Sequence, residues 1–270
     1  MYIPFKKALE NWIEKSGYHL RRQTSQDEIR SLLRGLHPRE SGHSLIRMGG
    51  NNDGGYLIPD DLSGINACFS PGIDETSAFE LDCAKQGMRL FLADASVSQV
   101  GPELSDTHYS FIKKFIGVSS DETHLTLDEW VDSTPEAEGE LLLQMDIEGS
   151  EYEALLNCTP KLLNRFRIVC LELHHIGEWR NPRYFQFVKK ALDRLTTNHD
   201  CVHSHPNNSA SIIRLGEMIL PNVMELTFLR KDRMKSTKLV TTFPHPLDAD
   251  CVPNLPHVPL PTCWYGRVDD

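Results

Sequence analysis

Residues 141–153 read LLLQMDIEGSEYE. An apolar run of strand length ends here in two carboxylates, Asp146 and Glu148, and a glycine and a helix start follow them. A buried strand that ends at acidic residues places charge at the carboxyl edge of a sheet, where open α/β sheets bind their ligands. The segment therefore predicts a ligand site at the end of a strand over 141–145.

Strands and helices alternate from residue 65 to residue 195, which predicts a parallel sheet with right-handed crossovers. The connection between the last two predicted strands has no strong helical pattern, so these two strands can pair antiparallel. The predicted strands are 65–70, 88–93, 111–118, 141–145, 167–173, 201–205 and 224–229, and the predicted helices are 76–86, 127–131, 151–156 and 184–195.

The chain divides into three predicted regions. Residues 1–48 are expected to form an N-terminal helical cover, in which Phe5, Leu9, Trp12 and Ile13 share one apolar face. Residues 49–232 are expected to form the main α/β domain. Residues 233–270 carry many prolines, which exclude a regular helix or a central strand, so we expect an extension packed on the domain.

Composition narrows the class of protein. A formal net charge of -10 argues against broad electrostatic binding to nucleic acid or to an anionic membrane. The seven cysteines are scattered and include no CxxC pair, which is typical of reduced thiols in the cytoplasm. There is no signal peptide pattern and no apolar run long enough to span a bilayer. We therefore expect a cytoplasmic protein with no nucleic-acid partner; the sequence carries no sign of its oligomeric state.

The ends of the first two predicted strands indicate the kind of ligand. Asp94 ends the second strand, where a carboxylate can accept two hydrogen bonds from the diol of a ribose, although an aspartate there can also cap a turn. The loop after the first strand has only Gly72, whereas a dinucleotide fingerprint needs G-x-G-x-x-G. A ligand with a ribose but no pyrophosphate fits better, and S-adenosylmethionine is the common one.

A family resemblance extends this interpretation. Residues 144–152 resemble the K-x-D-x-E-G-x-E segment of the FkbM-type S-adenosylmethionine-dependent methyltransferases, and residues 69–73, 79–80 and 125–131 match as well. Residues 53–56, 203–208 and 221–228 resemble a related branch of methyltransferase-like proteins. The resemblance implies an α/β class I methyltransferase fold over residues 49–232. This Rossmann-like sheet has seven strands, is mostly parallel with an antiparallel last strand, and is flanked by helices.

The resemblance also implies where S-adenosyl-L-methionine would bind. Gly72 and its neighbours would lie along the methionine part, and Asp94 would hold the ribose. Asp121 or Ser120 would approach the adenine, and Asp146 would sit beside the methyl-transfer site. The full predicted cofactor set is Asp53, Gly54, Gly55, Tyr56, Ser70, Gly72, Ile73, Asp94, Asp121 and Asp146.

The expected reaction is O-methylation of a hydroxyl on a small molecule or a sugar. We expect His174 or Glu148 to take the acceptor proton, with Asp146 and Glu172 orienting it directly or through a metal. Carboxylates with imidazole suit a divalent ion: related O-methyltransferases of this fold use magnesium, while imidazole favours a transition metal. The predicted catalytic residues are Asp146, Glu148 and His174, and the predicted metal ligands are Asp146, Glu172, His174, His203 and His205.

Two alternatives remain open at the level of the sequence. Gln144 stands where the family has lysine, and Pro71 interrupts the glycine loop, which favours a non-catalytic binding protein with a methyltransferase fold. The acidic and histidine residues alone also fit a metal-dependent hydrolase. His203 and His205 share one face of a strand, where local hydrogen bonding is the alternative to a ligand role.

Overall fold

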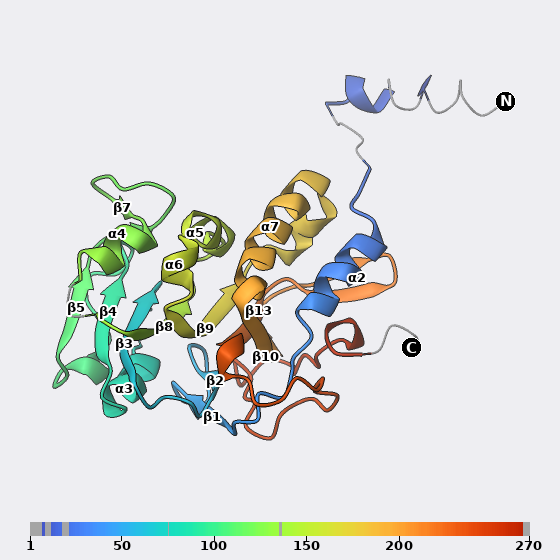
Figure 1. Cartoon of the computed structure of the whole chain (residues 1–270). Helices are drawn as coiled ribbons and strands as arrows, with labels where there is room; N and C mark the ends of the chain where they lie inside the picture. Colours follow the sequence, from blue (N-terminus) through green and yellow to red (C-terminus); the bar gives the residue numbers. More distant parts are fainter. Residues whose placement is uncertain (1–6, 9–11, 18–21, 75, 135–136, 267–270) are drawn as a thin grey trace.

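A seven-stranded mixed sheet with the order β10–β13–β9–β8–β3–β4–β5 forms the centre of the computed structural model (Figure 1). The structure describes residues 7–8, 12–17, 22–74, 76–134 and 137–266. Neighbours from β9 to β5 run parallel, and β13 runs antiparallel to both β9 and β10. The predicted mostly parallel seven-stranded sheet is thereby confirmed. Its strands are β3 (Ile65–Pro71), β4 (Arg89–Ala93), β5 (Tyr109–Ile112), β8 (Glu140–Met145), β9 (Phe166–Leu173), β10 (His199–Pro206) and β13 (Met224–Arg230).

Each face of the sheet has its own hydrophobic core. In β8, Leu141, Leu143 and Met145 pack beneath the helices of one face, while Leu142 belongs to the core of the other. Burial on both sides explains why this strand reads as a continuous apolar run. The first core lies under α4 (Leu127–Asp132), α5 (Glu151–Asn157), α6 (Pro160–Leu163), α7 (Pro182–Asn198) and α2 (Gln26–Gly35). The second lies under α3 (Ala78–Lys85) and the hairpin of β1 (Leu45–Met48) and β2 (Tyr56–Pro59).

The third predicted strand is wrong in its bounds. The strand that joins the sheet is β5, which ends at Ile112, because the chain turns at Lys113 and Lys114. The rest of the predicted strand becomes β6 (Phe115–Ile116), which pairs with β7 (His124–Leu125) in a separate ribbon. Two hairpins were not predicted as strands: β1–β2, and β11 (Ile212–Leu215) with β12 (Met218–Pro221). The predicted antiparallel pairing of the last two strands is confirmed.

The described aromatic residues nearest the two ends of the chain differ in burial. Phe5 and Leu9 fall outside the described residues, and Trp12 is exposed. Near the other end, Trp264 in the short helix η4 (Thr262–Trp264) is fully buried and packs against Trp179 of η2 (Ile176–Arg180), with ring centroids 6.3 Å apart. None of the helices in the described part of the chain combines the length and apolar character that a membrane crossing needs. Two further short helices are η1 (Pro102–Leu104) and η3 (Lys231–Arg233).

Candidate active site

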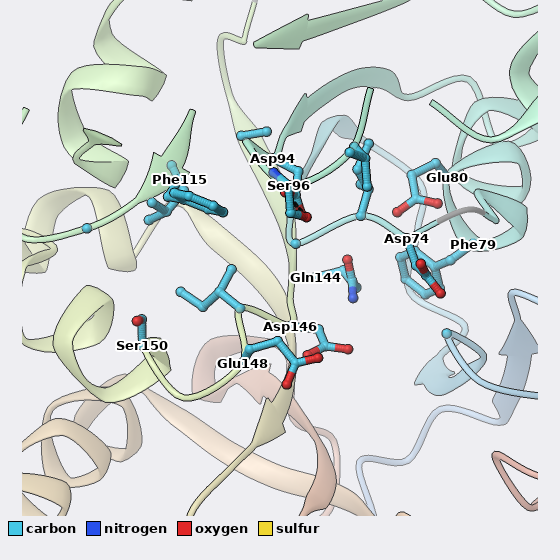
Figure 2. A pocket seen from close by; sticks show the side chains of 18 of the residues that line it. Asp74, Phe79, Glu80, Asp94, Ser96, Phe115, Gln144, Asp146, Glu148 and Ser150 are labelled. Atoms are coloured by element: carbon cyan, nitrogen blue, oxygen red, sulfur yellow. Dashed lines mark hydrogen bonds between the residues drawn. The ribbon is translucent and has the colours of Figure 1, made fainter. Parts of the chain in front are cut away.

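A cavity of about 690 Å³ opens at the carboxyl ends of β3, β4 and β8. Gly72 follows β3, Asp94 follows β4 and Asp146 follows β8, and all three line this cavity. Figure 2 shows the side chains of Asp94 and Asp146 on opposite sides of the space. The sequence-based expectation that these strand ends share one edge of the sheet is therefore confirmed. Of the predicted cofactor set, the residues that line the cavity are Asp53, Gly54, Gly72, Ile73, Asp94, Asp121 and Asp146.

The loop after β3 passes very close to the end of β8. Gly72 has φ +82°, and a Cβ atom on it would lie 1.4 Å from the backbone oxygen of Asp146. The amide of Gly72 donates to Ala93 O (3.0 Å), and the amide of Asp146 donates to Pro71 O (3.3 Å). Only glycine fits between these two strand ends, so the close packing of the β3 loop against β8 depends on Gly72.

Two of the acidic side chains that line the cavity, Asp94 and Asp121, accept hydrogen bonds from residues of their own loops. Oδ1 of Asp94 accepts hydrogen bonds from the amide and the hydroxyl of Ser96, both at 2.6 Å. Asp121 accepts from the amides of Thr123 and His124 at 2.7 Å, and these bonds hold the pKa of Asp121 well below its ordinary value. Asp121 therefore caps the turn before β7, although its place on the cavity wall agrees with the prediction.

His174 lies just beyond β9 and faces a group of carboxylates. Its Nε2 is 3.8 Å from Asp146 Oδ1 and 3.4 Å from Glu148 Oε2. Figure 2 shows the carboxylates of Asp146 and Glu148 side by side. Oδ1 of Asp146 is buried and has no hydrogen-bond partner in the described part of the chain, whereas the Glu148 side chain is 87% exposed. The three predicted catalytic residues are thus brought together, with an unused carboxylate oxygen among them.

Glu151 is a residue of this site to which the sequence interpretation gave no role. It is 0% exposed, and its Oε1 accepts from His174 Nδ1 and from the amides of Ile147 and Gly149, all at 3.1 Å. Glu148 adopts a left-handed conformation (φ 56°) in the turn that presents these amides. Such strain in a non-glycine residue is common at functional sites. The signals in the sequence were its place as the last acid of the K-x-D-x-E-G-x-E segment and at the start of the helix after the glycine.

The surroundings change the proton affinity of these groups. Burial lowers the pKa of His174, but the hydrogen bond and charge of Glu151, with the charges of Glu172 and Glu148, outweigh it, so the pKa is raised. Burial, together with the charge of Glu172, raises the pKa of Asp146 well above its ordinary value. The pKa of Glu172 is also raised by burial, although its hydrogen bond with Asp146 acts to lower it.

A buried polar row stands behind one wall of the cavity and contains two predicted cofactor residues, Ser70 and Tyr56. The hydroxyl of Ser70 hydrogen-bonds with Glu80 and with Gln144, and Gln144 Nε2 donates to Tyr56 Oη (3.4 Å). Burial raises the pKa of Glu80 above its ordinary value. Ser70, Tyr56 and Gly55 therefore do not line the cavity as predicted; Gln144 and Glu80 do.

The five predicted metal ligands do not form one group. Within the described residues, the ligand atoms of Asp146, Glu148 and His174 lie within 4.8 Å of one another. His203 and His205 instead face Asp248 of the proline-rich segment, with Nε2 of His203 2.8 Å from Asp248 Oδ1. The sequence did not reveal this pairing, because Asp248 is far from both histidines along the chain.

Comparison with known proteins gives one family. The sequence model described as the methyltransferase FkbM domain matches residues 60–201, which is more than half of the chain. The match spans β3 to β9 and so includes the strand ends that line the cavity. A search of curated proteins found no match.

Proposed function

Given that the chain belongs to the FkbM methyltransferase family, we propose that it transfers a methyl group from S-adenosylmethionine to a hydroxyl of a small molecule or sugar. The observation that carries the proposal is that Gly72, Asp94 and Asp146, from three neighbouring strands, line one cavity. Class I methyltransferases would use these strand ends for the methionine part, the ribose and the transferred methyl group respectively.

The residues of the cavity fit this cofactor. Gly72 brings the loop after β3 against the backbone of Asp146, so two of the strand ends that would hold the cofactor meet at one wall of the cavity. Oδ1 of Asp94 is held by Ser96, which orients the carboxylate for a diol. Val97, Phe115 and Ile147 add an apolar portion that suits a planar base. The volume of about 690 Å³ is in the range of ordinary cofactor sites.

His174 is the proposed general base. When bound, the cofactor supplies an electrophilic methyl group, so the protein has to align an acceptor oxygen and accept its proton. Glu151 holds Nδ1 of His174, which leaves Nε2 directed toward Asp146 and Glu148. In this proposal Asp146 positions the acceptor hydroxyl, and His174 Nε2 takes the proton as the new bond to carbon forms.

A divalent cation held by Asp146, Glu148 and His174 is the competing way to activate the hydroxyl. Their ligand atoms are close enough, and carboxylates with imidazole are suitable donors. A chelator separates the two routes: activity that persists in excess EDTA supports proton transfer to His174, and activity restored only by added metal supports the cation.

The test of the proposed function has a binding part and a turnover part. Calorimetry with S-adenosylhomocysteine should show saturable binding, which Asp94→Asn weakens and Asp132→Asn, on the exposed surface of α4, leaves unchanged. Production of S-adenosylhomocysteine with a library of hydroxylated acceptors should be lost in Asp146→Asn with the fold retained. Binding without turnover across the library would instead indicate the non-catalytic alternative, and no binding at all would refute the proposal.

A further inference from the structure

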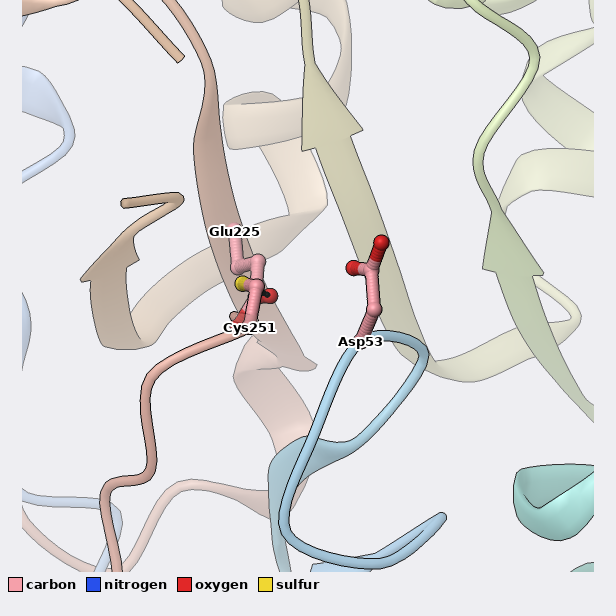
Figure 3. A group of neighbouring side chains, drawn as sticks. All are labelled: Asp53, Glu225 and Cys251. Atoms are coloured by element: carbon pink, nitrogen blue, oxygen red, sulfur yellow. Dashed lines mark hydrogen bonds between the residues drawn. The ribbon is translucent and has the colours of Figure 1, made fainter. Parts of the chain in front are cut away.

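A second group of potential ligand atoms joins three distant parts of the chain. Asp53 lies in the glycine-rich loop of residues 49–55, which precedes β2. Glu225 lies on β13, and Cys251 lies in the proline-rich segment (Figure 3). Their ligand atoms are within 4.8 Å of one another. The thiol of Cys251 donates to Glu225 Oε1 (2.9 Å), and the amide of Asp53 donates to Cys251 O (3.0 Å).

The charges at this place are poorly balanced. Glu225 is 5% exposed and stands opposite Glu172 in the antiparallel register, an arrangement in which like charges destabilise a sheet. Arg47, whose charge acts on Glu225, donates to the carbonyl groups of Gly50 and Asn52. In the described part of the chain, neither Asp53 nor Glu225 forms an ion pair with a lysine or arginine. A bound cation would neutralise the two carboxylates.

A buried imidazole with an unused nitrogen is an independent observation that points to a ligand. His205 is 3% exposed and is the cross-strand partner of Glu225 in the β10–β13 register. Its Nδ1 faces Asp248 (3.7 Å), whereas Nε2 is buried without a hydrogen-bond partner among the described residues. The strand register sets His205 opposite Glu225, and their charges act on each other, while the ring lies outside the three-residue group of ligand atoms.

We propose that Asp53, Glu225, Cys251 and His205 form a binding site for a thiophilic divalent metal ion such as zinc. Thiolate, imidazole and carboxylate are the three ligand types that zinc accepts, in a tetrahedral arrangement. The thiol of Cys251 loses its proton to solvent when the sulfur binds the ion. The site is separate from Asp146 and His174, and it does not depend on the proposed methyl transfer.

Such an ion would tie the proline-rich segment and the glycine-rich loop to β13. Because Asp53 also lines the cavity, metal binding would fix the loop that forms part of the cavity wall. The expected consequence is a more stable protein with an unchanged reaction centre.

Cobalt(II) is the probe, because a cysteine thiolate bound to it gives a charge-transfer absorption band. Titration of the metal-free protein should produce this band with saturation at one equivalent. Cys251→Ser should abolish the band, and Cys263→Ser, a cysteine in the same segment whose thiol donates to Ile219 O, should keep it. Zinc should displace cobalt and raise the melting temperature of the wild-type protein.

Asp53→Asn is a second test, needed because Cys251→Ser changes a buried residue and can disturb the fold. Asp53 is exposed, so a change there is tolerated more readily. It should weaken cobalt binding at least about tenfold, the loss that even changes around the ligands of a metal site produce. The proposal is overturned if no thiolate band forms, if the band survives in Cys251→Ser, or if Asp53→Asn binds cobalt as tightly as the wild type.

Discussion

Glu151 raises the proton affinity of His174 and holds its ring in place through Nδ1. Replacing Glu151 by Gln keeps the shape and an acceptor for the two backbone amides but removes the negative charge. Burial of His174 then acts with less opposition, so we expect the pKa of His174 to fall. Titration of the imidazole by NMR measures this shift, and the rise of the reaction rate with pH should move to lower pH in parallel, with a lower plateau.

Glu178→Gln is the matched control for this change, because Glu178 is exposed and near in sequence, while the main influences on the pKa of His174 are burial and the charges of Glu151, Glu172 and Glu148. It should leave the imidazole titration where it is. A His174 pKa that stays the same in Glu151→Gln would show that the contact at 3.1 Å does not set the proton affinity of the ring.

Individual site residues differ in how far the sequence could reveal them. Gly72, Asp94 and Asp146 follow apolar strands directly, so the strand pattern alone placed them on one edge. Glu151 is also next to a strand end, but its role depends on a turn that folds it back onto His174. Ser70 shows the opposite error, because it lies inside β3 and its side chain faces the buried row instead of the cavity.

Among the elements, those with continuous apolar runs were predicted most closely. The central strands β8 and β9 are buried on both faces, so their sequences identify them without tertiary information. The hairpin β11–β12 was harder to predict, because Ile212 and Ile219 are exposed and give no buried pattern. Only the antiparallel pairing of the two strands defines it. β5 ended earlier than expected because hydrogen bonds to β4, which the sequence does not show, decide where the strand leaves the sheet.

The proline-rich segment is held to β10 by a buried ionic contact. Asp248 lies between His203 and His205, and all three side chains are nearly inaccessible to solvent. Burial would raise the pKa of Asp248, but the two imidazoles hold it well below its ordinary value. Removing one partner of a buried ion pair leaves the other uncompensated, so Asp248→Asn should lower the free energy of unfolding by roughly 3 kcal/mol. Denaturant titration at neutral pH measures the loss.

Asp250→Asn provides the comparison, since Asp250 pairs with His257 at 2.9 Å near the surface of the same segment. An exposed pair contributes little, so the expected loss is below about 1 kcal/mol. Equal losses in the two variants would mean that the contact of Asp248 with β10 does not anchor the segment.

At the scale of the whole molecule, buried acids accumulate along one edge of the sheet. Glu172 on β9 and Glu225 on β13 face each other, and Asp146 hydrogen-bonds with Glu172. Burial, opposed in part by the charge of His205, raises the pKa of Glu225 to about 8. The sequence shows each acid separately, but only the strand order reveals that they are neighbours. Glu225 should therefore make the metal-free protein less stable as the pH rises.

The sign follows from proton binding. Between the ordinary value of 4.5 and about 8, unfolded Glu225 is ionised while folded Glu225 keeps its proton, so unfolding releases a proton and the free energy of unfolding falls with rising pH. One such group contributes a slope of about 1.4 kcal/mol per pH unit. His174 and His205, whose pKa values are raised, lose their stabilising contribution as the pH rises through those values, so they act in the same direction.

Denaturant titrations of the metal-free protein between about pH 5 and about pH 8 test this expectation. Glu225→Gln should reduce the downward slope by about one proton, because glutamine does not titrate. Asp232→Asn should leave the slope unchanged, since the hydrogen bond from Arg230 lowers the pKa of Asp232, and its contribution is constant above about pH 5. If Glu225→Gln keeps the wild-type slope, Glu225 is ionised in the folded protein.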